Sequence, residues 1–385
     1  MAIAVKRYTS LMTGAPTLSG TVGTLISLLD ACLKDGFNTT APTSATQTAG
    51  TATLSFGAAH GYNVNDVIKI SGANESAWNN EFRVLTVDTN SLTFAISSGT
   101  TSPATGTLSC KIAPLGWTKP YSGTNKAAYL PAAAYVQCYL RVRDDSSTPT
   151  SASGRWAKVR GYETMSDVDT GTGLFPTAAQ STNGLCLFKS STSDSTARDW
   201  WLVGDGGIFY LGTFAHATYP TTAGGYIFGD IASLRAGDGY SSLILGIESD
   251  TLPNYASTTM SVLGSYSESQ AGKYLARTHG QTGTAVAAGL MGDNGVSTYI
   301  GYTGLTYPHP PDNGLLFAPV AVVESSIIRS RALPGLYQPL HSTPLGYLDT
   351  VTSLPDFPGR TFQAFSLGHL NEVAQCLIDI TGPWR

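Results

Sequence analysis

The sequence predicts a mainly β protein: an antiparallel β-sandwich or jelly-roll-like main domain, a small inserted β-sandwich module and a short N-terminal helix. Composition is the first reason, because only 12% of the 385 residues are charged, whereas there are 19 Tyr, 13 Phe and 42 Gly. Aromatic residues favour strands, and glycine favours the turns between them. The second reason is that short alternating apolar segments recur between turn residues. The third is that sustained helical spacing occurs near the N-terminus alone.

Residues 1–37 are expected to form an N-terminal arm followed by a helix. Apolar residues recur at helical spacing on one face over Thr21–Leu33. Ser19 or Thr21 can cap the start of this helix, because a side-chain oxygen there accepts a hydrogen bond from a free backbone N–H. Gly36 supplies the left-handed residue that commonly ends a helix. We expect the apolar face to pack on the main body or on a neighbouring subunit.

Residues 38–113 are predicted to form a separate small sandwich or barrel. Five short alternating segments indicate its strands: Thr51–Phe56, Val67–Ile70, Phe82–Val87, Ser91–Ile96 and Thr107–Ile112. Their near-regular spacing, with Gly, Asn, Asp and Pro between them, is typical of such modules. A unit of this length can fold alone.

Residues 114–385 are predicted to form the main β-rich domain. The predicted strands are Lys126–Tyr129, Val136–Arg143, Ala157–Tyr162, Leu185–Lys189, Trp200–Val203, Ile208–Phe214, Ile227–Ile231 and Ser242–Ile247. Leu333–His341 is bounded by prolines and is expected to be a loop rather than a central strand. The absence of an internal sequence repeat argues against propellers and solenoids.

No segment carries a motif for catalysis, a cofactor or a metal ion, so the chain is predicted not to be an enzyme. Gly204-Asp205-Gly206-Gly207 lacks the phosphate-loop pattern and lies between two strands, which indicates a hairpin turn. Asp167–Gly173 resembles the start of a calcium loop but lacks its later ligands, so a polar turn is the preferred interpretation. His309–Asp312 has no second histidine at metal-ligand spacing. The five cysteines are isolated, which argues against a zinc site and a disulfide framework.

Charge and hydropathy limit the partners. The net charge is -4 and no basic run occurs, so direct binding to nucleic acid is not expected. No stretch is long and apolar enough to predict a membrane span, and the N-terminus lacks the order of a signal peptide. The protein is therefore expected to stay in the cytosol until it assembles. Few charges with many hydroxyls and aromatics suit surfaces buried between subunits, which favours a homo-oligomer.

The chain ends on Gly382-Pro383-Trp384-Arg385, directly after an imperfect alternation that predicts a closing strand. Pro383 limits the freedom of the backbone, and Trp384 offers a large apolar area to bury. We expect this terminus to be docked, in its own domain or on a neighbouring copy, with Trp384 buried and Arg385 near an acidic or carbonyl partner. The candidate interface residues of the chain are Leu25, Leu29, Trp117, Tyr337, Pro383, Trp384 and Arg385.

Four blocks of sequence carry a family resemblance. They are Gly14–Gly20 with Leu28–Phe37, Gly116–Ala127, Arg160–Glu163 with Asp167–Gly171, and Leu333–Tyr337 with Asp379–Arg385. These blocks resemble virion structural proteins of tailed bacteriophages, of the neck, collar or tail-associated kind. The resemblance implies a non-enzymatic assembly protein of the virion, built into the particle in the host cytoplasm. Its implied partners are copies of itself and other neck, tail or capsid proteins.

The segment 38–113 resembles the small immunoglobulin-like β modules that are inserted in phage surface proteins. Ala59–Tyr62 and Ser102–Thr107 are its most typical stretches. The resemblance implies a module that faces outward and is dispensable. Without it, Gly36-Phe37 and Gly116-Trp117 would be close to adjacent in the sequence.

Two other functions remain open at this stage. One is a head decoration protein, which would share the same composition. The other is a host-binding tailspike that recognises or cleaves a host glycan, for which Trp200-Trp201 could stack on sugar rings. The preferred interpretation of these two tryptophans is core or subunit interface, because successive strand residues point to opposite faces.

Overall fold

The computed structural model of the chain describes residues 5–145, 154–216, 221, 223–248, 271–291, 305–324, 328–341, 344–369 and 372–385. Strands account for 48% and helices for 5%, and the ladders between the named strands are antiparallel, which confirms the predicted mainly β fold. In this part of the chain, no helix has the length and apolar character needed to cross a membrane.

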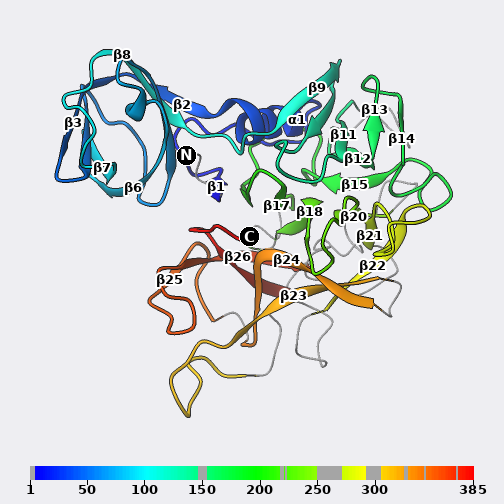
Figure 1. Cartoon of the computed structure of the whole chain (residues 1–385). Helices are drawn as coiled ribbons and strands as arrows, with labels where there is room; N and C mark the ends of the chain where they lie inside the picture. Colours follow the sequence, from blue (N-terminus) through cyan, green and yellow to red (C-terminus); the bar gives the residue numbers. More distant parts are fainter. Residues whose placement is uncertain are drawn as a thin grey trace.

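Residues 37–112 form a seven-stranded sheet of their own, which nearly closes on itself (Figure 1). Its strands are β2 (Phe37–Thr40), β3 (Pro42–Thr48), β4 (Thr51–Phe56), β5 (Val67–Ala73), β6 (Glu81–Val87), β7 (Ser91–Ala95) and β8 (Gly106–Ile112). Trp78, Phe82 and Phe94 pack in its interior, and the ring centroid of Phe94 lies 4.3 Å from that of Phe82 and 6.2 Å from that of Trp78. The sequence predicted five of these strands and missed β2 and β3.

In the described residues, the body is a network of 18 hydrogen-bonded strands. In chain order these are β1 (Lys6–Thr9), β9 (Thr118–Gly123), β10 (Lys126–Leu130), β11 (Tyr139–Arg143), β12 (Trp156–Tyr162), β15 (Leu185–Phe188), β16 (Trp200–Gly204), β17 (Ile208–Thr213), β18 (Gly224–Asp230), β19 (Ala232–Ser233), β20 (Ser242–Ile247), β21 (Ala271–Leu275), β22 (Val286–Met291), β23 (Phe317–Glu324), β24 (Ile328–Pro339), β25 (Thr350–Thr352), β26 (Thr361–His369) and β27 (Glu372–Asp379). The strands β23–β27 form a layer beside the strands that precede them (Figure 1). A separate hairpin consists of β13 (Thr164–Met165) and β14 (Gly171–Thr172).

The middle of the body is buried on both faces of its strands. All the residues of β16, β17 and β20 are buried, including Trp200 and Trp201. The indole N–H of Trp201 donates to the Ser366 carbonyl oxygen at 3.2 Å. The core interpretation of the two tryptophans is therefore correct, and neither ring is available to a sugar.

The expectation of a loop at Leu333–His341 is wrong, because β24 continues through Pro339 and pairs with both β23 and β27. A proline removes one donor from a ladder, so a sheet accepts it at an irregularity. The β23–β24 register shifts between the partners of Ala332 and Tyr337, and Pro334 lies within that interval. The β23–β24 ladder therefore continues on both sides of Pro334.

The N-terminal helix begins later than predicted, and only its first half is α-helical. The α-helix α1 (Thr24–Leu29) is followed directly by a π-helical stretch, Asp30–Asp35, and neither Ser19 nor Thr21 caps it. Gly23 precedes the helix in the left-handed conformation, and the Leu25 N–H donates to the Asp144 carboxylate at 2.9 Å. The helix therefore begins where an acceptor from a distant segment reaches it, which a local pattern cannot show.

The module leaves and rejoins the body at one point. Strands β2 and β8 pair through Phe37 and Ile112, so its first and last strands are neighbours. On the body side, the Leu115 N–H donates to the Cys32 carbonyl oxygen at 2.9 Å, and the Gly116 N–H to that of Leu33 at 3.0 Å. The two ends of the module thus meet at the end of the π-helical stretch.

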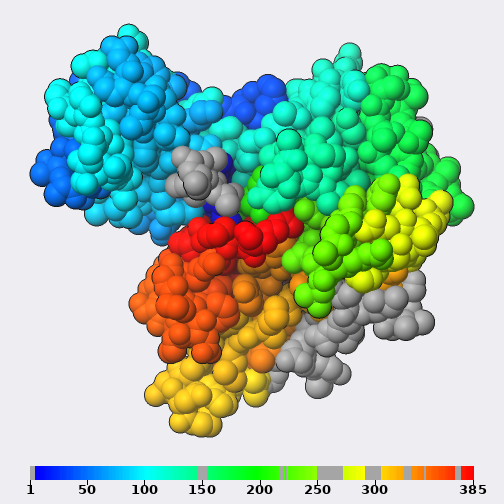
Figure 2. Space-filling view, viewed as in Figure 1, coloured from blue at the N-terminus to red at the C-terminus, as the bar shows by residue number. Residues whose placement is uncertain are grey.

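Polar contacts dock the module on the N-terminal strand β1. Lys6 pairs with Glu81 at 2.9 Å, Arg7 contacts Asp66 at 3.4 Å, and Arg83 donates to the Val5 carbonyl oxygen at 3.0 Å. In the space-filling view the module is a distinct lobe beside the body (Figure 2). The module is thus joined to the body by two neighbouring chain connections and by polar contacts, as is usual for a domain inserted at one place in another.

We expect that deleting residues 38–113, so that Phe37 is joined to Pro114, leaves a soluble and folded body. Phe37 is kept because its ring packs on Tyr8, with centroids 6.0 Å apart. Circular dichroism and size-exclusion chromatography would measure the result, with the isolated module, residues 37–113, melted in parallel as the control. An insoluble or unfolded remainder would show that the module is part of the folding unit of the body.

Candidate functional site

Segments that are far apart in the sequence meet where the chain ends. We call this group the terminal cluster; its members are Trp117, Tyr135, Asp205, Tyr210, Asp230, Gly335, Trp384 and Arg385. They come from β17 and β18, from the turn that precedes β17, from β24, and from residues that follow β27 or lie beside β9 and β10. The C-terminal residues lie at the surface, where they appear in red in Figure 2.

Trp384 is held by its ring and by its N–H. The indole N–H donates to the Asp379 carbonyl oxygen at 2.8 Å, and the ring centroid lies 5.7 Å from that of Tyr210. A Cβ placed on Gly335 would lie 2.1 Å from the indole nitrogen of Trp384, so only glycine leaves room for this ring. Gly335 also has a positive φ of 68°, which favours glycine a second time.

Arg385 has the acidic and carbonyl partners that the sequence predicted. Its guanidinium donates to the Asp230 carbonyl oxygen at 2.8 Å and lies 3.4 Å from carboxylate oxygens of Asp205 and Asp230. It also lies over the Tyr135 ring, 4.8 Å from the centroid. Burial raises the pKa of Asp230, and the charge of Arg385 acts in the opposite direction.

The hairpin turn predicted at Gly204–Gly207 is present, and it contributes Asp205 to this cluster. The Asp205 carboxylate accepts the N–H groups of Gly207 and Ile208 at 2.8 and 2.9 Å, which shapes the turn. Its backbone carbonyl oxygen accepts the indole N–H of Trp117 at 3.1 Å. Sequence reasoning missed Asp205, Asp230 and Tyr135 as partners of Arg385. For Asp205 a signal was available, because it is an acidic residue inside a glycine-rich turn.

The structure corrects several of the predicted interface residues. Leu25, Leu29 and Trp117 are 0%, 1% and 2% exposed, so they belong to the core of their own chain and cannot form a contact surface. Their apolar pattern reflected packing inside the body rather than between subunits. Trp384 is only partly buried, because it packs at the rim of the core, while Pro383 and Arg385 are exposed.

Tyr337 belongs to a group of four aromatic rings that includes Phe317, Phe357 and Phe362. The pairwise centroid distances within this group are 5.0–5.6 Å. Phe362 is buried, whereas the other three rings are partly exposed. Burial raises the pKa of the Tyr337 hydroxyl above its usual value. Tyr337 thus remains near the surface as a candidate contact residue.

The weakly calcium-like loop is closed by protein groups. The Asp167 carboxylate accepts the N–H groups of Asp169 and Thr170 at 2.7 and 2.9 Å, and Asp169 pairs with Lys126 and Arg141. The polar-turn interpretation agrees with this geometry. Among the residues that the structure describes, no three His, Cys, Asp or Glu side chains gather as metal ligands would.

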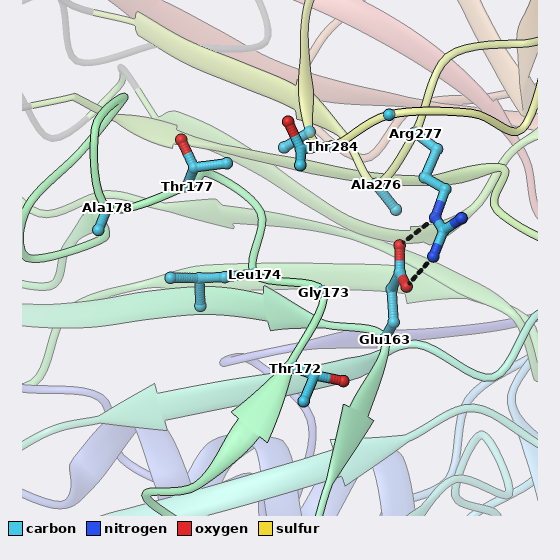
Figure 3. A pocket seen from close by; sticks show the side chains of 11 residues that line it. Glu163, Thr172, Gly173, Leu174, Thr177, Ala178, Ala276, Arg277 and Thr284 are labelled. Carbon is cyan, nitrogen blue, oxygen red and sulfur yellow. Dashed lines mark hydrogen bonds and ion pairs between the residues drawn. The ribbon is translucent and has the colours of Figure 1, made fainter.

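One pocket of about 470 Å³ lies between the β13–β14 hairpin and the turn from β21 to β22 (Figure 3). Glu163 and Arg277 lie at one side of it and form two hydrogen bonds with each other, each 2.6 Å long. The guanidinium of Arg277 also lies over the Tyr240 ring, 3.9 Å from its centroid. Sequence reasoning missed this pocket, because 114 residues separate its two charged groups.

Comparisons with known proteins identify no family for this chain. No protein-family model matches it, and no curated protein matches it. Among solved structures, a phage phi92 endosialidase aligns with 12% identity and a TM-score of 0.17. The alignment covers 90% of this chain and 52% of that one, so this chain spans about half the length of the solved protein. At this TM-score the likeness carries no argument about fold or activity.

We expect Trp384→Ala to lower the free energy of unfolding of the monomer by about 2 kcal/mol. A fully buried tryptophan costs roughly 3–5 kcal/mol when truncated, and Trp384 is only partly buried. Denaturant unfolding of dilute protein would measure the loss, with Trp384→Phe as a control that keeps most of the apolar contact. An unchanged midpoint for Trp384→Ala would mean that the terminus contributes nothing to the fold of the monomer.

Proposed function

We propose that this chain is a structural subunit of a tailed-bacteriophage particle, located at the neck, collar or tail. It acts through subunit interfaces, as a homo-oligomer and with other particle proteins, and it needs no cofactor and performs no catalysis. The folded module is proposed to project from the particle surface. Obligate interfaces that support such an assembly typically bury about 2,000 Å² or more.

The observation that carries this proposal is the terminal cluster. Two of the four blocks that resemble phage virion proteins contribute to it: Gly116–Ala127 through Trp117, and Leu333–Tyr337 with Asp379–Arg385 through Gly335 and Trp384. A resemblance dispersed along the sequence thus coincides with one place in the fold. Pro383 and Arg385 are exposed at its outer part, where a neighbouring subunit could contact them.

Imaging of intact particles tests the location. Particles labelled with an antibody raised against residues 37–112 should carry the label at the neck or tail. A label distributed over the head would support a head decoration protein instead. Particles without label would contradict a role in the virion, and hydrolysis of a host polysaccharide by the purified chain would contradict the non-catalytic assignment.

We expect Arg385→Ala to weaken assembly much more than it weakens the monomer. The ion pairs of Arg385 are partly exposed, so their loss should lower the free energy of unfolding by less than about 1 kcal/mol. Analytical ultracentrifugation of the oligomer and thermal melting of dilute monomer would separate the two effects. Arg235→Ala is a suitable control, because Arg235 is also exposed and lies outside the terminal cluster. Equal assembly of both variants would remove the terminus from the interface.

A further inference from the structure

We infer that the pocket beside Glu163 and Arg277 is a binding site for a neutral saccharide unit. The inference goes beyond the assembly role proposed above and does not depend on it. Four features support the inference: a charge-balanced ion pair, a cavity lined by small residues, threonine hydroxyl groups in the lining, and two loops that are hydrogen-bonded to each other.

The charge of the pocket is balanced. The carboxylate of Glu163 and the guanidinium of Arg277 form a bidentate pair, and the Glu163 side chain is largely buried. An anionic ligand would have to displace Glu163 from Arg277, and a cationic ligand would have to displace Arg277 from Glu163. A neutral ligand meets neither cost, and it can still donate to the second lone pairs of the carboxylate oxygens.

Glycine clears the space that the ion pair needs. A Cβ placed on Gly173 would lie 2.3 Å from Cγ of Glu163. The Glu163 side chain therefore occupies the space that a side chain at position 173 would need. Gly173 has a positive φ of 64°. The remaining small lining residues are Ala178, Ala276, Gly283 and Ala285. Together they leave a volume of about 470 Å³, within the roughly 300–1,000 Å³ of ordinary ligand pockets.

The lining suits a molecule with many hydroxyl groups. Thr172, Thr177 and Thr284 line the pocket, and a hydroxyl group can both donate and accept (Figure 3). The Thr172 hydroxyl bonds to that of Thr164 at 2.7 Å, and the Thr177 hydroxyl accepts the Gln180 N–H at 3.3 Å, so each has remaining capacity for a ligand. Leu174 supplies an apolar wall for the C–H face of a sugar ring. None of the 11 lining residues is aromatic, so the site lacks a stacking platform. We therefore expect dissociation constants in about the millimolar range for one sugar unit, and useful avidity only from several copies.

The two loops are joined independently of a ligand. The side-chain amide of Gln180 donates to the Ala285 carbonyl oxygen at 2.9 Å, and its oxygen accepts the Thr177 N–H at 2.8 Å. Behind the pocket, the guanidinium of Arg331 donates to the Arg277 carbonyl oxygen at 3.3 Å. A pocket held in this way loses little conformational entropy when a ligand enters.

Saturation-transfer NMR on the full chain tests the inference. The probes are D-glucose, D-galactose and N-acetyl-D-glucosamine, with N-acetylneuraminic acid as the acidic comparison, each at millimolar concentration. The blocking variant is Ala178→Trp, because Ala178 is exposed and lines the pocket. The matched control is Ala179→Trp, because Ala179 is exposed and does not line it.

At least one neutral sugar should show transfer with the natural chain and with Ala179→Trp, and should lose it with Ala178→Trp. Glu163→Gln keeps the shape but leaves Arg277 uncompensated, so it should weaken the neutral sugar about tenfold and allow the acidic sugar to bind. The inference is overturned if no neutral sugar shows transfer. It is also overturned if Ala178→Trp keeps the signal, or if the natural chain binds the acidic sugar alone.

Discussion

Replacing Lys189 with Met should lower the free energy of unfolding by about 3–5 kcal/mol, the usual cost of leaving one member of a buried ion pair alone. The side chains of Lys189 and Asp144 are both 0% exposed and contact each other directly. The Lys189 ammonium also donates to the Thr21 carbonyl oxygen at 2.7 Å, and Asp144 accepts the Leu25 N–H at 2.9 Å. This pair therefore joins the start of α1 to the ends of β11 and β15.

The double variant Asp144→Asn with Lys189→Met is the control, because it removes both charges and keeps an acceptor for the Leu25 N–H. It should recover a large part of the loss in denaturant unfolding at pH 7. If Lys189→Met is as stable as the natural chain, or if the double variant is no better than the single one, the buried pair does not have this structural role.

The loss in Lys189→Met should also shrink as the pH falls from 7 to 5. Burial raises the pKa of Asp144 to about 6 even beside Lys189, and removing the cation raises it further. A carboxyl whose folded pKa exceeds its unfolded pKa of about 3.9 binds a proton more readily in the folded state. The folded state therefore gains stability as the pH falls from the folded pKa toward the unfolded pKa. Denaturant unfolding of the variant and of the natural chain at pH 7 and pH 5 measures this difference.

Leu29→Asp should destabilise the chain by roughly 3–5 kcal/mol, because it places an uncompensated charge in the core. Leu29 is 1% exposed and lies on the buried face of α1, together with Leu25 and Leu28. Ser27→Asp is the matched control, because Ser27 is exposed on the same helix. Thermal melting should show a large fall for the first variant and almost none for the second. Equal melting temperatures would mean that the apolar face of α1 is not buried in solution.

Local patterns predicted the strands well where one rule was enough. The strands predicted at Lys126–Tyr129 and Trp200–Val203 correspond to β10 and β16. The prediction failed at Pro334, because a register shift in the β23–β24 ladder accommodates a proline that the local rule excludes. It also failed at the start of α1, where the deciding acceptor, Asp144, lies more than 100 residues away.

Of the terminal cluster, the sequence predicted only the C-terminal residues. The sequence pointed to Trp384 and Arg385, and to an acidic or carbonyl partner for Arg385. It could not supply Asp205, 180 residues away, or the space that Gly335 leaves for the indole. The pair formed by Glu163 and Arg277 was invisible for the same reason, since neither residue has a local motif.

The sequence by itself determined the mainly β composition of the chain, about half of the strands described and its glycine-rich turns, because backbone propensities and the period of two act over a few residues. Only the tertiary structure decided which apolar residues face the core of their own chain, as Leu25, Leu29 and Trp117 do. It also decided which charges meet, because contacts such as those of Arg385 and Glu163 form when distant strands pair, and a one-residue change of register would turn each side chain to the opposite face.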